Sequence, residues 1–233
     1  MTPLGLGLGR RRRGSLESED LPPPFHPEPL VEGGFVARRL TLLVVLLLVL
    51  PATAFAATVK VRVEGKTRTL FGPTEVTVTA STPLEAIQQA SLLGELYYHV
   101  TTTSFGPYVD QVGLYGGDAS SGWVFKVDDV SPPVGADQVQ LKDGDRVLWY
   151  YATFGATGGP PTLRVKAATK KGCYTATAFD DNGKPVVASS LVWHIGSKKN
   201  VPAMAGAAFC PGPHTGLLIR ATAAGAVRSN AVA

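Results

Sequence analysis

Apolar and polar residues alternate most regularly between Gly122 and Tyr151. Odd-numbered positions are apolar in three runs, at residues 123–127, 139–141 and 147–151. A period of two is typical of a strand that buries one face and turns the other to solvent. Asp143-Gly144 separates the last two runs and predicts a hairpin with a type I′ turn. The stretch therefore predicts three short strands joined by two turns.

The residues before this stretch predict two strands followed by a helix. Valines alternate with charged residues over 59–63, and Val76 and Val78 mark a second strand. Thr82 fits a helix N-cap, Pro83 the first helical position and Glu85 the third helical position, where a capping box has its glutamate. We expect this helix to run to about Leu93 and to stop at Gly94.

A further hairpin is predicted between the helix and Gly122. Its strands cover residues 97–103 and 108–114, and Phe105-Gly106-Pro107 forms the connection. The order over about 58–155 is then β-β-α-β-β-β-β-β. This order predicts one helix lying across one curved, mostly antiparallel sheet.

Several motifs in this region occur in the order typical of one protein family. They are Gly122-Trp123, the turn Asp128-Asp129, the segment 134–137, the segment 141–145 and the strand 147–151. With them, residues 58–154 resemble the transcobalamin-like C-terminal domain family, bacterial domains of unknown function that are similar to the small β domain of the cobalamin carriers. The resemblance implies a β-grasp-like fold. Asp128-Asp129 replaces the family's usual Asn-Gly, which predicts a longer or differently shaped turn.

Residues 156–161 predict a linker, because Gly158-Gly159-Pro160-Pro161 combines four turn-forming residues. Residues 162–233 then hold short apolar runs at near-regular spacing, at 163–167, 173–179, 186–195, 216–223 and 227–232. This spacing predicts a small β-sandwich. The segments 178–186 and 221–233 resemble bacterial Ig-like domains. The fold class expected for the whole chain is therefore mainly β, a β-grasp-like domain followed by an Ig-like sandwich.

The N-terminal part has the plan of an export signal. Arg38-Arg39 precede an apolar run over 40–50, and Ala54-Phe55-Ala56 is a small-residue cleavage site. Residues 36–56 are thus expected to be a signal peptide, with an uncleaved membrane anchor as the alternative. Residues 1–35 predict a disordered or untranslated leader with translation starting at Val36, against a genuine long leader. We expect the protein to be secreted or held at the cell surface.

The two cysteines, Cys173 and Cys210, are expected to pair in an exported protein. The bond would close a loop of about 37 residues and stabilise the fold by roughly 4 kcal/mol on the chain-entropy estimate. Two free thiols or a metal site are the alternatives. The formal charge of +4 is small, so we expect no nucleic-acid partner.

Catalytic signatures are missing from the sequence. It holds no G-x-S-x-G, H-E-x-x-H, P-loop or dinucleotide-binding pattern, so we expect no enzymatic activity and no catalytic residue. Calcium could bind at Asp143 and Asp145, or at residues 180–182, although turn formation alone explains both clusters. We therefore predict no metal site.

The aromatic residues divide into two expected groups. Trp123, Trp149 and Trp193 are at strand positions that face inward by parity, which predicts core packing. Five tyrosines are candidates for an exposed aromatic surface: Tyr97, Tyr98, Tyr108, Tyr115 and Tyr150.

Three functions are compatible with these patterns. The favoured one is a non-catalytic binding or structural module whose partner is an extracellular protein, a glycan or a small ligand. The second is a corrinoid-like small-ligand binder acting with a partner domain, since the resemblance makes cobalamin a candidate; otherwise no cofactor is expected. The third is an unrecognised extracellular enzyme. A membrane contact is expected only through an uncleaved signal peptide. Loop position predicts these ligand-binding residues: Tyr108, Tyr115, Asp128, Asp129, Val134 and Asp137.

Overall fold

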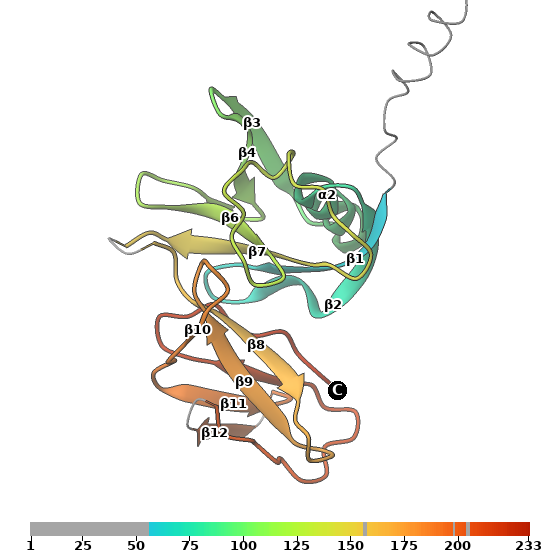
Figure 1. The fold of residues 1–233 in the computed structure, drawn as a ribbon, viewed down its shortest axis with the longest axis vertical. Coiled ribbons are helices and arrows are strands. Elements are labelled where there is room, and N and C mark those ends of the chain that lie inside the picture. The colour runs from blue at the N-terminus through green and yellow to red at the C-terminus, as the bar shows by residue number, and fades with distance from the viewer. Residues whose placement is uncertain (1–55, 156–157, 198, 204–205) are drawn as a thin grey trace, which may run out of the picture. The chain divides into compact units, whose positions relative to one another are not determined.

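The computed structural model describes residues 56–155, 158–197, 199–203 and 206–233, which belong to one compact unit. The expected leader over 1–35 lies outside the described residues, as does all but the last residue of the expected signal peptide over 36–56. Among the described residues, no helix is both long enough and apolar enough to cross a bilayer. The fold is mainly β, as predicted (Figure 1).

The N-terminal half is built on a mixed four-stranded sheet with the order β2-β1-β7-β6. Its strands are β1 (Ala57–Glu64), β2 (Thr69–Ala80), β6 (Ser121–Val127) and β7 (Arg146–Thr153). β1 pairs antiparallel with β2 and parallel with β7, and β7 pairs antiparallel with β6. A central parallel pair between two hairpins, with a helix in the long crossover, is the β-grasp-like arrangement that was expected.

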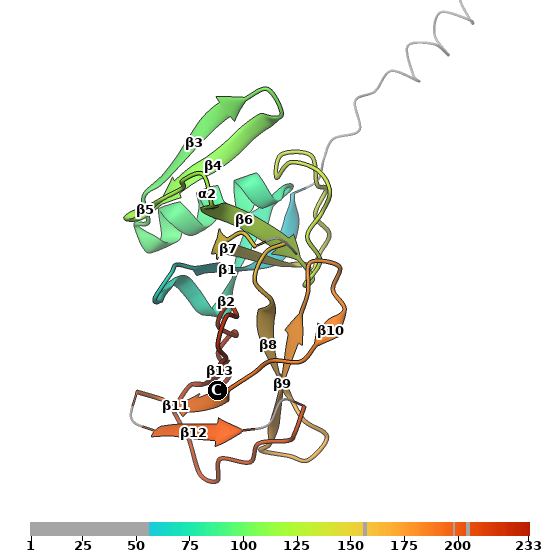
Figure 2. The same cartoon turned by 90° about the vertical axis from the view of Figure 1, so that its left-hand side faces the viewer.

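One helix, α2 (Pro83–Gly94), packs on one face of this sheet (Figure 2). The Thr82 hydroxyl caps it by accepting a hydrogen bond from the Glu85 amide at 3.2 Å. The Glu85 carboxylate accepts in turn from the Ser81 amide, one residue before the cap. The helix ends where Glu95 adopts a left-handed φ of 49°. The predicted start and stop are therefore confirmed.

A second, three-stranded sheet lies beside the first. It consists of β3 (Tyr98–Thr103), β4 (Gly106–Val112) and β5 (Tyr115–Gly116), in that order. The predicted hairpin over 97–114 is confirmed by the pairing of β3 with β4. The short strand β5 was not predicted, because only two residues form it.

The predicted strand over 139–141 is wrong. These residues form a loop whose amide hydrogen bonds go to other segments, as that of Leu141 does to the Ser81 carbonyl at 2.9 Å. Leu141 is nevertheless buried, so its alternation with polar neighbours reflects packing of a loop rather than a strand. The turn at Asp143-Gly144 is not type I′ either, because only Gly144 has a positive φ.

The turn at Asp128-Asp129 is also different from the expectation. Both aspartates have positive φ, 49° and 74°, and Val127 and Val130 exchange two backbone hydrogen bonds across them. The connection is therefore a two-residue turn with the φ signs of type I′, not a longer one. Aspartate tolerates left-handed φ better than most non-glycine residues, which explains why Asn-Gly can be replaced here.

The C-terminal half is a small sandwich of two three-stranded sheets, as predicted. One sheet contains β8 (Thr162–Ala167), β9 (Tyr174–Phe179) and β10 (Pro185–Val186); the other contains β11 (Leu191–Ile195), β12 (Lys199–Ala203) and β13 (Ile219–Thr222). A second apolar core around Leu163, Trp193 and Ile219 fills the space between them. Cys173 and Cys210 form the predicted disulfide, with an S–S distance of 2.05 Å.

Two details of the sandwich were not predicted. The strand β12 has no alternating pattern and contains Pro202, so its sequence gave no strand signal. The segment 227–232, expected to be a strand, makes only the isolated bridges of Val227 to Thr162 and Val232 to Ile219. The expected domain boundaries, 58–155, 156–161 and 162–233, stay a prediction.

The second face of the β6–β7 hairpin is buried, contrary to the expectation that it faces solvent. Leu148, Tyr150 and Ala152 pack there against Val227, which comes from the C-terminal half. Even-numbered residues of β7 are therefore as deeply buried as the odd-numbered ones. A period-two pattern cannot reveal this when the covering segment is distant in sequence.

Charged side chains are buried on the same face. Lys126 has no solvent exposure, and its Nζ donates to the Asp180 carbonyl at 2.7 Å. Glu64, also without exposure, binds Arg62 at 2.9 Å and Arg228 at 3.0 Å. Because Arg228 and Asp180 belong to the C-terminal half, the two halves are joined by buried polar contacts as well as apolar ones.

A candidate ligand cleft at the edge of β6

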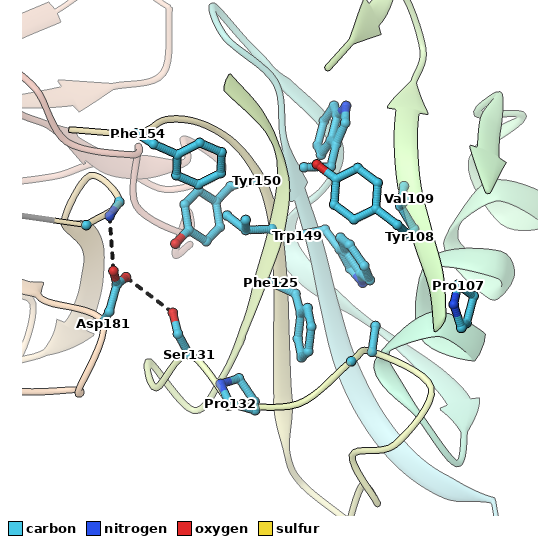
Figure 3. Close-up of a pocket in the computed structure, with 16 residues that line it drawn as sticks. Pro107, Tyr108, Val109, Phe125, Ser131, Pro132, Trp149, Tyr150, Phe154 and Asp181 are labelled. Carbon is cyan, nitrogen blue, oxygen red and sulfur yellow. Dashed lines mark hydrogen bonds between the residues drawn. The ribbon is translucent and has the colours of Figure 1, made fainter. Parts of the chain in front are cut away.

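A cleft of about 390 Å³ opens beside β6, a volume within the range of small-ligand sites (Figure 3). Its lining is largely aromatic. Six rings contribute to it: Tyr108, Trp123, Phe125, Trp149, Tyr150 and Phe154. The polar groups at the cleft are few, which is typical of sites that bind by apolar contact and orient the ligand with a small number of hydrogen bonds.

The cleft lies across the outer edge of the four-stranded sheet, where β6 is the last strand. Phe125 and Trp149 belong to the core under helix α2. Tyr150 and Val124 belong to the cluster on the opposite face. Residues from both faces of the sheet therefore line one continuous space, and Figure 3 shows Tyr150 and Phe154 on the Asp181 side and Tyr108 on the β4 side.

Tyr108 reaches the cleft because Gly122 has no side chain. A Cβ atom at Gly122 would lie 2.3 Å from the Tyr108 hydroxyl oxygen, which is closer than such atoms can approach. Partial burial raises the pKa of Tyr108, while a hydrogen bond with the Trp123 backbone opposes the rise. The glycine of the Gly-Trp motif thus has a packing role at the rim of the cleft.

The two tryptophans in the wall are fixed by hydrogen bonds from their indole nitrogens. Trp123 Nε1 donates to the Tyr115 carbonyl at 2.7 Å, and Trp149 Nε1 donates to the Pro83 carbonyl at 3.0 Å. The rings of Phe125 and Trp149 lie 5.2 Å apart between centroids. With their polar atoms satisfied inside the fold, the two tryptophans form a nearly buried base of the wall, and the partly buried Phe125 lies against them.

Asp181 supplies the one charged side chain of the lining. Its carboxylate accepts from the Gly159 amide at 3.1 Å and the Ser131 hydroxyl at 3.2 Å, and lies 3.3 Å from Lys126 Nζ. Burial acts to raise the pKa of Asp181, but these hydrogen bonds and the lysine charge outweigh it, so the pKa is lowered. Burial lowers the pKa of Lys126 despite its carboxylate neighbours.

Tyr150 lies next to the polar group formed by Asp181 and Ser131. Burial is the main cause that raises its pKa, with a smaller contribution from the Asp181 charge, while a hydrogen bond with Ser131 acts in the opposite direction. The ring has 1% exposure, so the expectation that Tyr150 belongs to an exposed surface is wrong. Its even-numbered position in β7 suggested solvent, but the C-terminal half covers that face.

Of the six predicted ligand-binding residues, only Tyr108 lines the cleft. Tyr115 is half-buried, and its hydroxyl lies 3.1 Å from that of Thr67. Asp128 pairs with Arg146 at 3.0 Å, and Asp129 pairs with Arg164. The two aspartates therefore hold a turn in place and are not directed into the cleft.

Val134 and Asp137 lie near a shallower groove that borders the cleft. Val134 is 45% exposed and lines this groove together with Tyr108 and the exposed Phe105. Asp137 is not part of either lining, and its Oδ1 is buried without a hydrogen-bond partner among the described residues. Of the six predicted residues, the groove therefore contains only Val134 in addition to Tyr108.

Backbone amides donate to carboxylates at both calcium candidates. Asp143 accepts from the Thr58 amide and Asp145 from the Lys142 amide, while Asp180 accepts from the amides of Asn182 and Lys184. Within the described part of the chain, no group of three or more His, Cys, Asp or Glu residues is placed to hold a metal ion.

Most of the cleft residues were not predicted as a site. Phe125 and Trp149 were assigned to the core by parity, which is correct but incomplete, because an edge strand exposes the rim of its core. Asp181, Ser131 and Gly159 are brought together from three loops. The cluster of turn residues at Gly158-Gly159 and at Asp181 indicated loops, but no local signal could have indicated that these loops meet.

Comparisons with known proteins find a similarity to one family over part of the chain. Residues 84–153 match a family described as "Domain of unknown function (DUF4430)". A crystal structure of a "putative metal binding protein" from Ruminococcus gnavus is similar at 16% identity, covering 42% of this chain and 99% of that one with a TM-score of 0.33. No curated protein matches.

The match over 84–153 includes helix α2 and all of β3 to β7, and hence most of the cleft wall. The segment is thus similar to a family of domains of unknown function, in agreement with that part of the expectation. The likeness to the small β domain of the cobalamin carriers stays a prediction.

Proposed function

We propose that the protein is an exported, non-catalytic binding module whose ligand enters the aromatic cleft at the edge of β6. The observation that carries the proposal is the cleft itself, a space of about 390 Å³ with six aromatic rings in its wall. Trp123, Trp149 and Tyr150 are almost fully buried, so the apolar surface that is open to water comes mainly from Phe154 and Tyr108, which are 45% and 38% exposed. Covering such surface with a ligand is favourable by about 25 cal/mol per Å².

The electrostatics of the cleft support binding rather than catalysis. A general acid or base works best with a pKa near the operating pH. Burial raises the pKa of Tyr108 and Tyr150, and hydrogen bonds lower that of Asp181. These three shifts move the pKa values away from neutral pH, whereas burial lowers the pKa of the neighbouring Lys126, which does not line the cleft.

Export is supported by the disulfide between Cys173 and Cys210 and by the signal-like pattern over 36–56. Disulfides persist in oxidising compartments, which include the cell exterior. We therefore place the protein outside the cytoplasm, either released or attached at the surface. Detection of the chain in the culture medium or on intact cells, with Ala57 as its first residue, would test this placement.

The proposed site is tested by titrating the chain from Ala57 with 8-anilinonaphthalene-1-sulfonate, an apolar fluorescent probe. We expect saturable binding accompanied by quenching of tryptophan fluorescence, because Trp123 and Trp149 line the cleft. The substitution Val124→Phe should fill the cleft and weaken binding about tenfold, the effect of losing about 1.4 kcal/mol. Leu114→Phe, at a residue with 90% exposure, is the matched control.

Equal binding by Val124→Phe and by the control would place the probe elsewhere and contradict the proposal. Cobalamin belongs in the same titration, as the candidate that the resemblance suggests. A corrinoid would contact the cleft with only a part of its surface. We therefore expect it to bind more weakly than a ligand that fits inside.

A further inference from the structure

At the outer edge of β6, some backbone groups form no hydrogen bond with any other described segment. In an antiparallel pair, alternate residues direct both their N–H and their C=O toward the partner strand. The Phe154 amide donates to the Ser120 carbonyl, and the Asp128 amide donates to the Arg146 carbonyl. Even-numbered residues of this strand therefore bond β7, and odd-numbered residues point to the free edge.

Both ends of this free edge are occupied. Near the start, the Ser121 carbonyl accepts from the Asp118 amide at 2.7 Å, and the Trp123 backbone is hydrogen-bonded to Tyr108. At the other end, Val127 bonds Val130 in both directions. Among the described residues, neither the N–H nor the C=O of Phe125 has a hydrogen-bond partner, and these two groups lie between the occupied ends.

The cleft surrounds this open position from both sides of the sheet. An extended chain directs successive side chains to opposite faces. A residue placed opposite Phe125 would direct its side chain toward Tyr108 and Trp149. Its neighbour would direct a side chain toward Tyr150 and Phe154. The lining thus offers two apolar sites on opposite sides of one strand edge.

We propose that the ligand of the cleft is an extended peptide segment that adds to β6 as a short extra strand. This inference rests on the proposed function, because it names the ligand class of the same cleft. The partial charges of the open edge, an N–H donor and a C=O acceptor on one residue, are complementary to those of a peptide backbone. Main-chain hydrogen bonds of this kind supply affinity, and side-chain sites supply specificity.

The charge of the lining indicates which peptide fits. Asp181 is its one charged residue, and Lys126 already neutralises it at 3.3 Å. Neither side-chain site therefore favours a charged residue. The peptide should carry two adjacent apolar residues, one for each face of the sheet.

In the test, a library of displayed random pentapeptides is selected for binding to the chain that begins at Ala57. Phe125→Pro removes the open N–H, and proline is tolerated at an edge position whose N–H does not bond the neighbouring strand. Phe125→Ala is the matched control, since both variants lose the ring and only one loses the donor. We expect enriched sequences to carry adjacent apolar residues and to bind Phe125→Pro about tenfold more weakly than Phe125→Ala.

N-methylated peptides provide a second measurement that needs no variant. Methylation of the residue opposite Phe125 should reduce affinity about tenfold, whereas methylation of its neighbour should have little effect. Hydrogen exchange at the Phe125 amide should slow on binding. These results decide the question even if Phe125→Pro does not fold.

Four results would overturn the inference. If no peptide is enriched while the fluorescent probe still binds the cleft, the proposal of strand addition is wrong and the proposed function is not affected. Peptides insensitive to both proline and N-methylation would show binding without strand pairing. A dimer in light scattering that Phe125→Pro abolishes would identify a second copy of the chain as the occupant. If neither probe nor peptide binds, the proposed function fails as well.

Discussion

The two faces of the β6–β7 hairpin are both buried, but by different kinds of contact. The odd-numbered face packs Trp123, Phe125 and Trp149 against the apolar core under helix α2. The even-numbered face mixes apolar residues with Lys126, whose Nζ is enclosed by carbonyls of the C-terminal half. The stability of the first face depends on how well side chains fill the core. The stability of the second depends on partners for its buried charges.

The difference shows how the chain can bury two faces of one sheet with a limited apolar content. A buried ion pair contributes little net stability compared with apolar packing, but removing one partner is costly because the other charge stays buried. The even-numbered face is therefore expected to specify how the halves meet. The odd-numbered face should provide most of the stability.

The largest effect is expected from Trp149→Ala on the odd-numbered face. The ring has 2% exposure, and its loss leaves a cavity and an unpaired Pro83 carbonyl. We expect the free energy of unfolding to fall by roughly 3–5 kcal/mol. Denaturant titration measures this free energy. Phe154→Ala, which removes a ring that is 45% exposed, is the control and should cost less than about 1 kcal/mol.

Glu64→Ala should have the largest effect on the even-numbered face. Its carboxylate is enclosed between Arg62 and Arg228, so its removal leaves two guanidinium groups without their counter-charge. We expect a loss of about 3 kcal/mol in the free energy of unfolding. Asp128→Asn, which removes the charge of the more exposed pair with Arg146 and keeps a side chain that tolerates left-handed φ, should cost less than about 1 kcal/mol. Equal effects would contradict the contrast drawn between buried and exposed pairs.

The free energy of unfolding at alkaline pH should depend on Tyr150, which lies on the even-numbered face. Burial raises the pKa of this group in the folded state, so above pH 10 the unfolded chain loses the Tyr150 proton while the folded chain keeps it. The unfolded state then binds fewer protons, and stability falls by up to about 1.4 kcal/mol per pH unit. Tyr150→Phe should remove this part of the slope. An unchanged slope between pH 10 and pH 11 would show that Tyr150 is not the group responsible.

The smallest change in stability is expected from the helix that covers the odd-numbered face. Thr82→Ala removes the hydroxyl that accepts from the Glu85 amide, which should cost about 1 kcal/mol. Thr82→Ser keeps the hydroxyl and should retain most of the stability. Thermal unfolding followed by circular dichroism compares the two. A loss of the same size in both variants would show that the cap is not the cause.

The sequence predicts the odd-numbered face well, because its elements follow local rules. The cap at Thr82 and the alternation around Trp123 both follow from neighbouring residues. The even-numbered face was missed. A lysine at position 126 indicates a solvent-facing position unless the segment that covers it is known.

The cleft was missed for a related reason. Tyr108 was predicted from its position in a hairpin, but Asp181 and Gly159 reach the same space only through the packing of the two halves. The strand predicted over 139–141 failed because alternation reports burial and not hydrogen bonding. Leu141 satisfies the first criterion without the second.

The central claim is that the cleft at the edge of β6 is the ligand site. Its most direct test is a series of amide ¹H–¹⁵N spectra of the chain from Ala57, recorded while the fluorescent probe is added. The account predicts shifts that concentrate on the lining, above all at Phe125, Tyr150 and Gly159. Shifts that concentrate instead on the exposed end of helix α2, at Leu92 and Leu93, would contradict it.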